Sequence, residues 1–320
     1  MWSGDGHGFT VNATEMPTKD FSLHPKRQVL HKASNFKVVF SNPSKNTAKP
    51  QIKVTYNKKE VTNTFLKSAE LQESSGSTSN LAQYFFNKLN LKPDRRHQID
   101  VYWRAGNNDS FSHLAYLPPY CSMNVPRSIA STAPFTPKLE YINTINSTAA
   151  EHRLNPTFLA GLIAQESGFN PSQVSHAKAI GLTQVTSIAD EEIKKIRPEW
   201  QSDPRIDKLS VYEIERLIKR QEINRKQDWR LNPKQAIEGG ALYVNYLINY
   251  WGQPENKTLL AENPKIEITE VILASYNSGA SRVKNKMKAR GEQWLDDDEL
   301  KEAFKYVNSV VSYCYHFSEE

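Results

Sequence analysis

Residues 155–168, which read NPTFLAGLIAQESG, decide the fold of this chain. Asn155 supplies a helix N-cap and Pro156 suits the first helical position, so we expect a helix to begin here. An apolar stripe then recurs at helical spacing and consists of Phe158, Leu159, Leu162 and Ile163. Glu166 follows four residues after Leu162 and therefore continues the face of the helix that points into the core.

Glu166 is the candidate catalytic residue. A charged carboxylate on an apolar helix face is costly unless it is paired or protonated. Burial raises the pKa of a carboxyl group, and a general acid must hold its proton near neutral pH. The alternative is a Glu at the end of the helix whose side chain has reached solvent, and spacing taken alone favours that alternative.

Helical periodicity continues on both sides of this stretch, from about residue 138 to the C-terminus. One helix opens at Asn232-Pro233 and stops at Gly252, another covers 268–276, and a last one includes 304–311. The highly charged residues 190–230 predict an inserted, solvent-facing helical arm. Because strands and helices do not alternate, a doubly wound sheet is excluded.

The front of the chain has a different character. Residues 36–40, 51–56 and 97–103 predict strands, while residues 81–91 have the spacing of a helix. We therefore expect an α+β protein of two domains, with a small N-terminal β-sandwich for which the immunoglobulin-like arrangement is one candidate. The expected parts are a loose N-terminal arm (1–30), a β-rich accessory domain (31–116), a Pro/Ser-rich linker (117–137) and a mainly helical domain (138–320).

Composition limits the class of protein. The chain has 320 residues, of which 38% are hydrophobic and 24% charged, as in a soluble globular protein long enough for two domains. No apolar run of the length that spans a membrane occurs, and the first residues lack the apolar region of a signal peptide. The chain is therefore expected to be cytosolic, or a mature form from which an export signal was removed.

Charge divides the chain in two. Residues 1–130 hold 17 Lys and Arg against 9 Asp and Glu, which is +8, and the remainder holds 24 against 26, which is −2. A basic face suits nucleic acid, a membrane or an anionic wall polymer, although simple solvation explains it equally well. The basic half lacks the signatures of nucleic-acid-binding domains, so a nucleic-acid partner is disfavoured.

Two cysteines, Cys121 and Cys314, leave two alternatives open. They are either unrelated buried thiols or partners in one disulfide, and a disulfide requires an oxidising compartment. Neither CxxC nor HExxH occurs, so no metal site is expected.

Several motifs in the second half carry a family resemblance. They are ESGFNP at 166–171, Ser175, GLTQV at 181–185, ASYNSG at 274–279, and Tyr306 followed by Val307. In this order and spacing the sequence resembles the soluble lytic transglycosylases and the related goose-type lysozymes over residues 138–316. The resemblance implies a lysozyme-like catalytic domain over 138–320.

The resemblance also implies a reaction. Glu166 would protonate the glycosidic oxygen between N-acetylmuramic acid and N-acetylglucosamine in peptidoglycan. The same carboxylate would then take the proton of the muramoyl C6 hydroxyl, which leaves a 1,6-anhydro end. If water attacked instead, the protein would be a hydrolytic lysozyme. No metal or organic cofactor is implied, and the substrate requires a periplasmic or secreted location.

The family's other site residues map onto five positions. Ser175 would bind substrate beside the acid, and Gln184 would line the glycan groove. Tyr276 would contact and orient the catalytic carboxyl, Asn277 follows it in the same loop, and Tyr306 would lie near the carboxyl. A packing or turn role is the alternative for each.

Departures from the family pattern suggest an altered substrate. Hydroxyl side chains replace apolar residues at Thr183, Thr186, Ser275 and Ser278. The glycan could then be partly N-deacetylated, with Asp190 as a second carboxylate. A further alternative is a non-catalytic glycan-binding module that uses Glu166 only as a polar contact. We expect the N-terminal domain to bind the wall or a protein partner.

Overall fold

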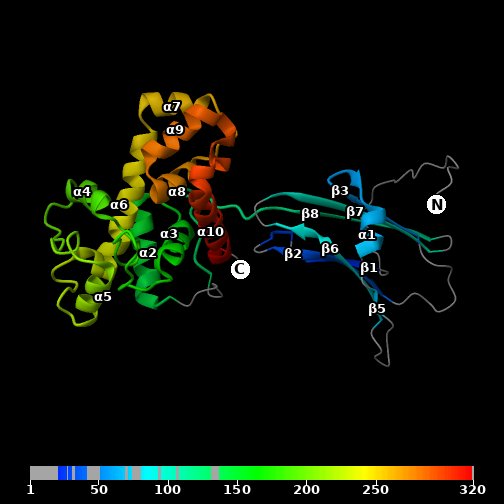
Figure 1. The fold of residues 1–320 in the computed structure, drawn as a ribbon, viewed down its shortest axis with the longest axis horizontal. Helices are drawn as coiled ribbons and strands as arrows, with labels where there is room; N and C mark the ends of the chain where they lie inside the picture. Colours follow the sequence, from blue (N-terminus) through cyan, green and yellow to red (C-terminus); the bar gives the residue numbers. More distant parts are fainter. Residues whose placement is uncertain are drawn as a thin grey trace. The chain divides into compact units, whose positions relative to one another are not determined.

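The computed structural model describes residues 21–26, 28–30, 33–41, 51–68, 71–73, 81–92, 95–105, 108–130 and 137–318. The chain divides into two compact units, Met1–Pro119 and Tyr120–Glu320, one rich in strands and the other in helices (Figure 1). Within the described ranges, no helix combines the length and apolar character needed to cross a membrane.

Two antiparallel four-stranded sheets build the first unit. One has the order β1-β2-β6-β5 and the other β4-β3-β7-β8. The bounds are β1 Phe21–His24, β2 Ser34–Ser41, β3 Gln51–Tyr56, β4 Lys59–Glu60, β5 Leu71–Glu73, β6 Leu81–Leu91, β7 His97–Ala105 and β8 Asn108–Tyr116, with helix α1 at Thr62–Ser68. Side chains of both sheets and of α1 share one core, which includes Phe36, Val54, Phe65, Ile99 and Val101.

Three predicted strands in this unit are confirmed as β2, β3 and β7, but the helix predicted over 81–91 is wrong. This segment is strand β6, which pairs with β2 and β5. Its register against β2 shifts at Asn35/Phe36, so residues 87–89 form an irregularity in the pairing. Because of this shift, Phe86 and Leu89 are both buried although they lie three residues apart. The irregularity in the strand therefore produces an apolar spacing that resembles that of a helix, which explains the wrong prediction.

The predicted arm and linker differ from the structure. Residues 1–20 of the arm lie outside the described residues, whereas Phe21–His24 form β1. Of the predicted linker, residues 131–136 are not described. Residues 120–130 belong to the second unit, where Cys121 and Met123 are part of the main hydrophobic core.

The second unit surrounds helix α3 (Pro156–Ser167), whose residues 157–164 are all buried. As predicted, Asn155 caps this helix, and its side chain accepts a hydrogen bond from the backbone of Thr157. The other helices, as Figure 1 labels them, are α2 Leu139–His152, α4 Ser187–Lys194, α5 Val211–Lys219, α6 Pro233–Trp251, α7 Pro254–Ala261, α8 Ile268–Ser278, α9 Ala280–Arg290 and α10 Lys301–Ser318. Short 3-10 helices cover Trp229–Leu231, Gly291–Asp296 and Asp298–Leu300.

Helices α3 and α10 pack so closely that their backbones lie side by side at Gly161. A Cβ atom on Gly161 would lie 2.8 Å from the backbone nitrogen of Cys314 and 2.9 Å from the carbonyl oxygen of Val310. Such distances exclude a larger side chain at Gly161, so the glycine permits the close approach. This contact brings residues of α10 alongside the helix that carries Glu166.

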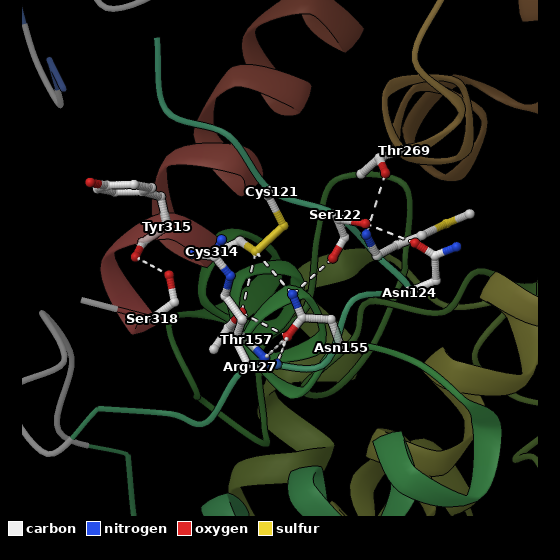
Figure 2. The surroundings of a disulfide bond; sticks show 11 residues. Cys121, Ser122, Asn124, Arg127, Asn155, Thr157, Thr269, Cys314, Tyr315 and Ser318 are labelled. Carbon is white, nitrogen blue, oxygen red and sulfur yellow. Dashed lines mark hydrogen bonds between the residues drawn. A yellow bond between two sulfur atoms is a disulfide. The ribbon is translucent and has the colours of Figure 1, made fainter. Parts of the chain in front are cut away.

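Cys121 and Cys314 form a disulfide, with their Cα atoms 5.9 Å apart (Figure 2). The bridge joins the start of the second unit to α10. Around it, Asn155 and Thr157 at the beginning of α3 approach the sulfur of Cys314, at 3.9 and 3.5 Å. Of the two alternatives for the cysteines, the disulfide is therefore the one realised.

The charged segment 190–230 is not a solvent-facing helical arm. Its helical parts are the end of α4, α5 and the short turn at 229–231. The remaining residues form turns. Buried apolar side chains come from these turns, as Ile206 and Ile223 do, and from α5, as Ile214 does. These side chains form a small core with Val174 and Ile180, which follow α3.

Candidate active site

Glu166 lies in the last turn of α3, which ends at Gly168 in the left-handed conformation. The Tyr306 hydroxyl on α10 donates a hydrogen bond of 2.5 Å to Glu166 Oε1. Burial raises the pKa of Glu166 to about 7, against the opposing effect of this hydrogen bond. The carboxyl group therefore keeps its proton up to about neutral pH, as a general acid requires.

Tyr276 on α8 makes a different contact from the one expected. Its hydroxyl donates a hydrogen bond of 2.7 Å to the backbone carbonyl of Thr183. Tyr276 still lies close enough to Glu166 to be affected by its charge. Burial, and then the charge of Glu166, raise the pKa of Tyr276 well above its usual value. The hydrogen bond to the Glu166 carboxyl comes from Tyr306.

Ser175 and Gln184 shape the loop that follows α3. The Ser175 hydroxyl accepts a hydrogen bond from the backbone of Ala179 at 3.0 Å. Gln184 has a positive φ of 48°, and its side-chain nitrogen donates to the carbonyls of Gln173 and Gly181 at 3.0 and 2.8 Å. Both polar side chains therefore fix the loop's conformation in this structure.

Asn277, in the last turn of α8, is close to Tyr276 in sequence. Its side-chain oxygen accepts a hydrogen bond of 2.9 Å from the hydroxyl of Ser278. This pair spans adjacent residues at the end of the helix, where the chain turns at Gly279.

Hydroxyls that depart from the family pattern are used inside the protein. Thr183 is 1% exposed and donates to the carbonyl of Ala236 at 2.8 Å. Ser275 is fully buried and accepts a hydrogen bond from the Trp251 indole at 2.9 Å, while Thr186 caps α4. Thr183 and Ser275 therefore do not present hydroxyls to a groove, which removes the reason to expect a deacetylated glycan from them.

Asp190 is a buried carboxylate with several donors. It accepts hydrogen bonds from Ser202 at 2.6 Å and from the Trp229 indole at 2.7 Å, and Lys194 lies 3.0 Å away. Burial acts to raise the pKa of Asp190, but these donors together outweigh it and lower the pKa below its usual value. Both of its oxygens are engaged, which favours a structural role over that of a second catalytic carboxylate.

Comparisons with known proteins point to one family. The sequence model of the transglycosylase SLT domain matches residues 143–298. The membrane-bound lytic murein transglycosylase C of Actinobacillus pleuropneumoniae is 26% identical over 144 residues, which cover 45% of this chain and 32% of that protein. The protein of the same name in Haemophilus ducreyi is 24% identical over 173 residues, 54% of this chain and 37% of the relative.

Residues 143–298 belong to the transglycosylase SLT family. The chain spans about a third of the length of the curated relatives that it matches. Among solved structures, the 70-kDa soluble lytic transglycosylase of Escherichia coli aligns with 55% of this chain and 24% of its own, with 20% identity and a TM-score of 0.39.

The SLT domain contains a row of aromatic rings that our sequence analysis missed. Tyr243 and Tyr246 of α6 stack with ring centroids 5.7 Å apart, and Tyr243 meets Tyr276 edge-on at 5.2 Å. All three are partly exposed. The sequence did indicate part of this row, since Tyr243 and Tyr246 are three residues apart in a predicted helix and therefore share one face of it. Aromatic side chains with one exposed face are typical of small-molecule and sugar sites.

Among the described residues, no group of three or more His, Cys, Asp and Glu side chains is placed to hold a metal ion.

Proposed function

We propose that this protein cleaves the glycan strands of peptidoglycan between N-acetylmuramic acid and N-acetylglucosamine, as a lytic transglycosylase. The observation that carries the proposal is the state of Glu166, a partly enclosed carboxyl with a pKa of about 7 and one hydroxyl donor. A binding module gains nothing from a carboxyl group that resists ionisation, whereas a general acid depends on it.

Glu166 would act twice in one turnover. As the acid, it gives its proton to the glycosidic oxygen while the bond from that oxygen to the muramoyl C1 breaks. As the resulting carboxylate, it takes the proton of the muramoyl C6 hydroxyl, whose oxygen bonds to C1 and closes the 1,6-anhydro ring. Glu166 ends protonated, so no further proton donor is needed between turnovers.

Tyr306 would position the carboxyl for both steps. Its hydrogen bond to Oε1 favours the ionised form that exists between them, because a donor stabilises charge on the acceptor. Burial and this hydrogen bond thus act in opposite directions, and their balance keeps the pKa of Glu166 near 7.

Hydrolysis by water is the second candidate for the same site, and would make the protein a lysozyme. The usual two-carboxylate hydrolase needs a second acidic side chain flanking the bond. The donors that surround Asp190 favour the one-carboxylate scheme. For this reason we place the transglycosylase first.

The glycan would lie along the row Tyr276, Tyr243 and Tyr246, with Ser175 and Gln184 holding the loop opposite the acid. Sugar rings have apolar faces that pack on aromatic rings. Asn277, beside Tyr276, would contribute a polar contact at the same end.

We infer that the N-terminal unit is an immunoglobulin-like sandwich that binds the wall or a protein partner. Its strand orders correspond to A-B-E-D and C′-C-F-G of that fold. The His97 side chain, at the start of β7, forms a hydrogen bond of 2.9 Å with the backbone carbonyl of Lys92. In immunoglobulin domains a tyrosine near the start of strand F bonds back to the backbone in a similar way. The net positive charge of residues 1–130 suits an anionic wall polymer.

A periplasmic or secreted location follows from the proposed substrate. The Cys121–Cys314 disulfide supports it, since disulfides persist in oxidising compartments.

Mass analysis of the fragments released from purified cell-wall sacculi tests the proposal. A transglycosylase releases 1,6-anhydro muropeptides, which are lighter by one water molecule than the reducing fragments of a lysozyme. Reducing ends would establish hydrolysis instead. If native protein releases nothing from acetylated or chemically deacetylated sacculi while still binding them, the glycan-binding alternative holds.

A further inference from the structure

The segment between α4 and α6 and the loop after the catalytic helix form one packed body. Val174 and Ile180 come from the loop, and they share a core with Ile206, Ile214, Ile218, Ile223 and Leu231 of the segment. Gly181 in the loop has a φ of +81°, and an added Cβ would lie 2.0 Å from the Arg230 carbonyl. The segment is therefore fixed to the loop that leaves Glu166.

A cavity of about 340 Å³ opens between these two parts. Ser172 lines it from the loop, while Ile218, Ile223 and Leu231 give it apolar lining. Arg225 and Lys226 line it from the segment, and both are exposed.

Arg225 and Lys226 give the cavity an uncompensated positive charge. Neither forms an ion pair with any residue that the structure describes. The nearest acidic residues in sequence, Glu222 and Asp228, do not line the cavity. Glu222 lies 3.8 Å from Arg220, and Asp228 pairs with Arg230 at 2.7 Å. A ligand that combines carboxylates with short apolar groups would match such a surface.

We propose that this cavity binds the stem peptide of the glycan strand that Glu166 cleaves. The inference rests on the proposed function and extends it from the glycan to its side branch. Stem peptides branch from the muramoyl unit next to the scissile bond and carry free carboxylates and methyl groups. Carboxylates would meet Arg225 and Lys226, and the apolar groups would meet Ile223 and its neighbours.

Chain length makes the distance feasible. Ser172 follows Glu166 by six residues, so the two lie at most about 22 Å apart when each residue spans up to about 3.6 Å. A short extended peptide gains the same length per residue. The true separation is shorter, because hydrogen bonds from the Asn170 backbone to the Ser167 carbonyl and from the Gln173 backbone to the Asn170 carbonyl, of 3.0 and 3.3 Å, fold this stretch into turns. A stem of a few residues anchored at the scissile bond can therefore reach the cavity.

The test combines cleavage with direct binding. The variant Arg225→Gln/Lys226→Gln removes both charges, and Lys208→Gln/Lys219→Gln removes two exposed charges of the same segment outside the cavity lining. We expect the cavity variant to lose about three- to tenfold in kcat/KM on peptide-bearing strands, through KM, because exposed charge pairs contribute modestly. On strands stripped of peptide by an amidase it should match the native protein, as should the control on both.

Titration of the isolated stem peptide, followed by NMR, separates this proposal from the proposed function. We expect the native protein and the control variant to bind it and the cavity variant to bind it several-fold more weakly. If strands are cut but the cavity variant and the control behave alike in both assays, the stem-peptide site is wrong and the glycosidase stands. If no strand is cut but the peptide binds through Arg225 and Lys226, the proposed function fails and the cavity stands.

Discussion

Two carboxylates in the SLT domain, Glu166 and Asp190, are both withdrawn from water but are surrounded differently. From the described part of the chain, Glu166 accepts a single side-chain hydrogen bond, that of the Tyr306 hydroxyl, and its pKa rises to about 7. Asp190 accepts hydrogen bonds from Ser202 and Trp229 and pairs with Lys194, and its pKa is lowered. Burial alone therefore does not make a catalytic acid, because the number of donors decides whether a buried carboxyl keeps its proton or holds a charge.

The largest expected effect separates the two carboxylates by activity. Glu166→Gln should lower glycan cleavage about a thousandfold, since general acid–base catalysis contributes about 10²- to 10⁴-fold. Muropeptide release from sacculi, followed over time, measures it. Glu151→Gln, an exposed Glu on α2, is the control and should cleave normally. Cleavage by Glu166→Gln within tenfold of native would remove Glu166 from the mechanism.

The next effect concerns stability at Asp190. Asp190→Asn should lower the free energy of unfolding by about 3 kcal/mol, because several donors lose a charged acceptor. Since the folded-state pKa of Asp190 is lowered, its contribution is complete above its ordinary pKa of 3.8 and disappears as pH falls through the lowered value. Urea unfolding at neutral pH measures it, with the exposed neighbour Glu191→Gln as control. An unchanged midpoint would mean that the donors do not stabilise the fold.

Stability at Glu166 should change in the opposite direction. Its pKa is raised from 4.5 to about 7, so the native protein loses stability as pH rises through this window. At about 1.4 kcal/mol per pKa unit, the loss over this window of pH reaches about 3.5 kcal/mol above pH 7. Glu166→Gln escapes this loss and should be more stable than native protein at pH 8, with little difference near pH 4. Equal unfolding curves at pH 8 would show that Glu166 is not destabilised by burial.

The smallest effect isolates the hydrogen bond to Glu166. Tyr306→Phe removes a donor to the charged form, so the pKa of Glu166 should rise by somewhat less than one unit if the bond is worth about 1 kcal/mol. The alkaline limb of the pH–rate profile should move upward with it. Tyr276→Phe, which loses a bond to the Thr183 carbonyl instead, should leave that limb in place. A limb that moves for Tyr276→Phe and not for Tyr306→Phe would reverse the roles of the two tyrosines.

Local signals predicted much of the helical unit. The Asn155-Pro156 and Asn232-Pro233 pairs begin α3 and α6 as expected, because capping depends on neighbouring residues only. The helix face singled out Glu166, but spacing alone favoured a solvent-exposed side chain, and only the surrounding family motifs made it the candidate acid. The choice between Tyr276 and Tyr306 was beyond the sequence, since it depends on how closely α10 packs against α3.

Long-range pairing explains the failures. The apolar pattern of β6 resembled that of a helix, because a shift in its register against β2 changes which of its residues are buried. Segment 190–230 seemed solvent-facing because its isoleucines are scattered among charges, and their partners Val174 and Ile180 come from another part of the chain. Thr183 and Ser275 similarly found partners that no local pattern indicates.

The disulfide turns residues 121–314 into a covalent ring that contains the whole matched SLT domain. One proteolytic cut inside this ring would open it without dividing the molecule, whereas one cut before Cys121 would release the N-terminal unit. With Cα atoms 5.9 Å apart, Cys121 and Cys314 also bring the beginning of the second unit close to its last helix, α10. Such adjacent ends are what circular permutation and insertion into a host loop require. The second unit is thus a module whose first and last elements are held together by one covalent bond.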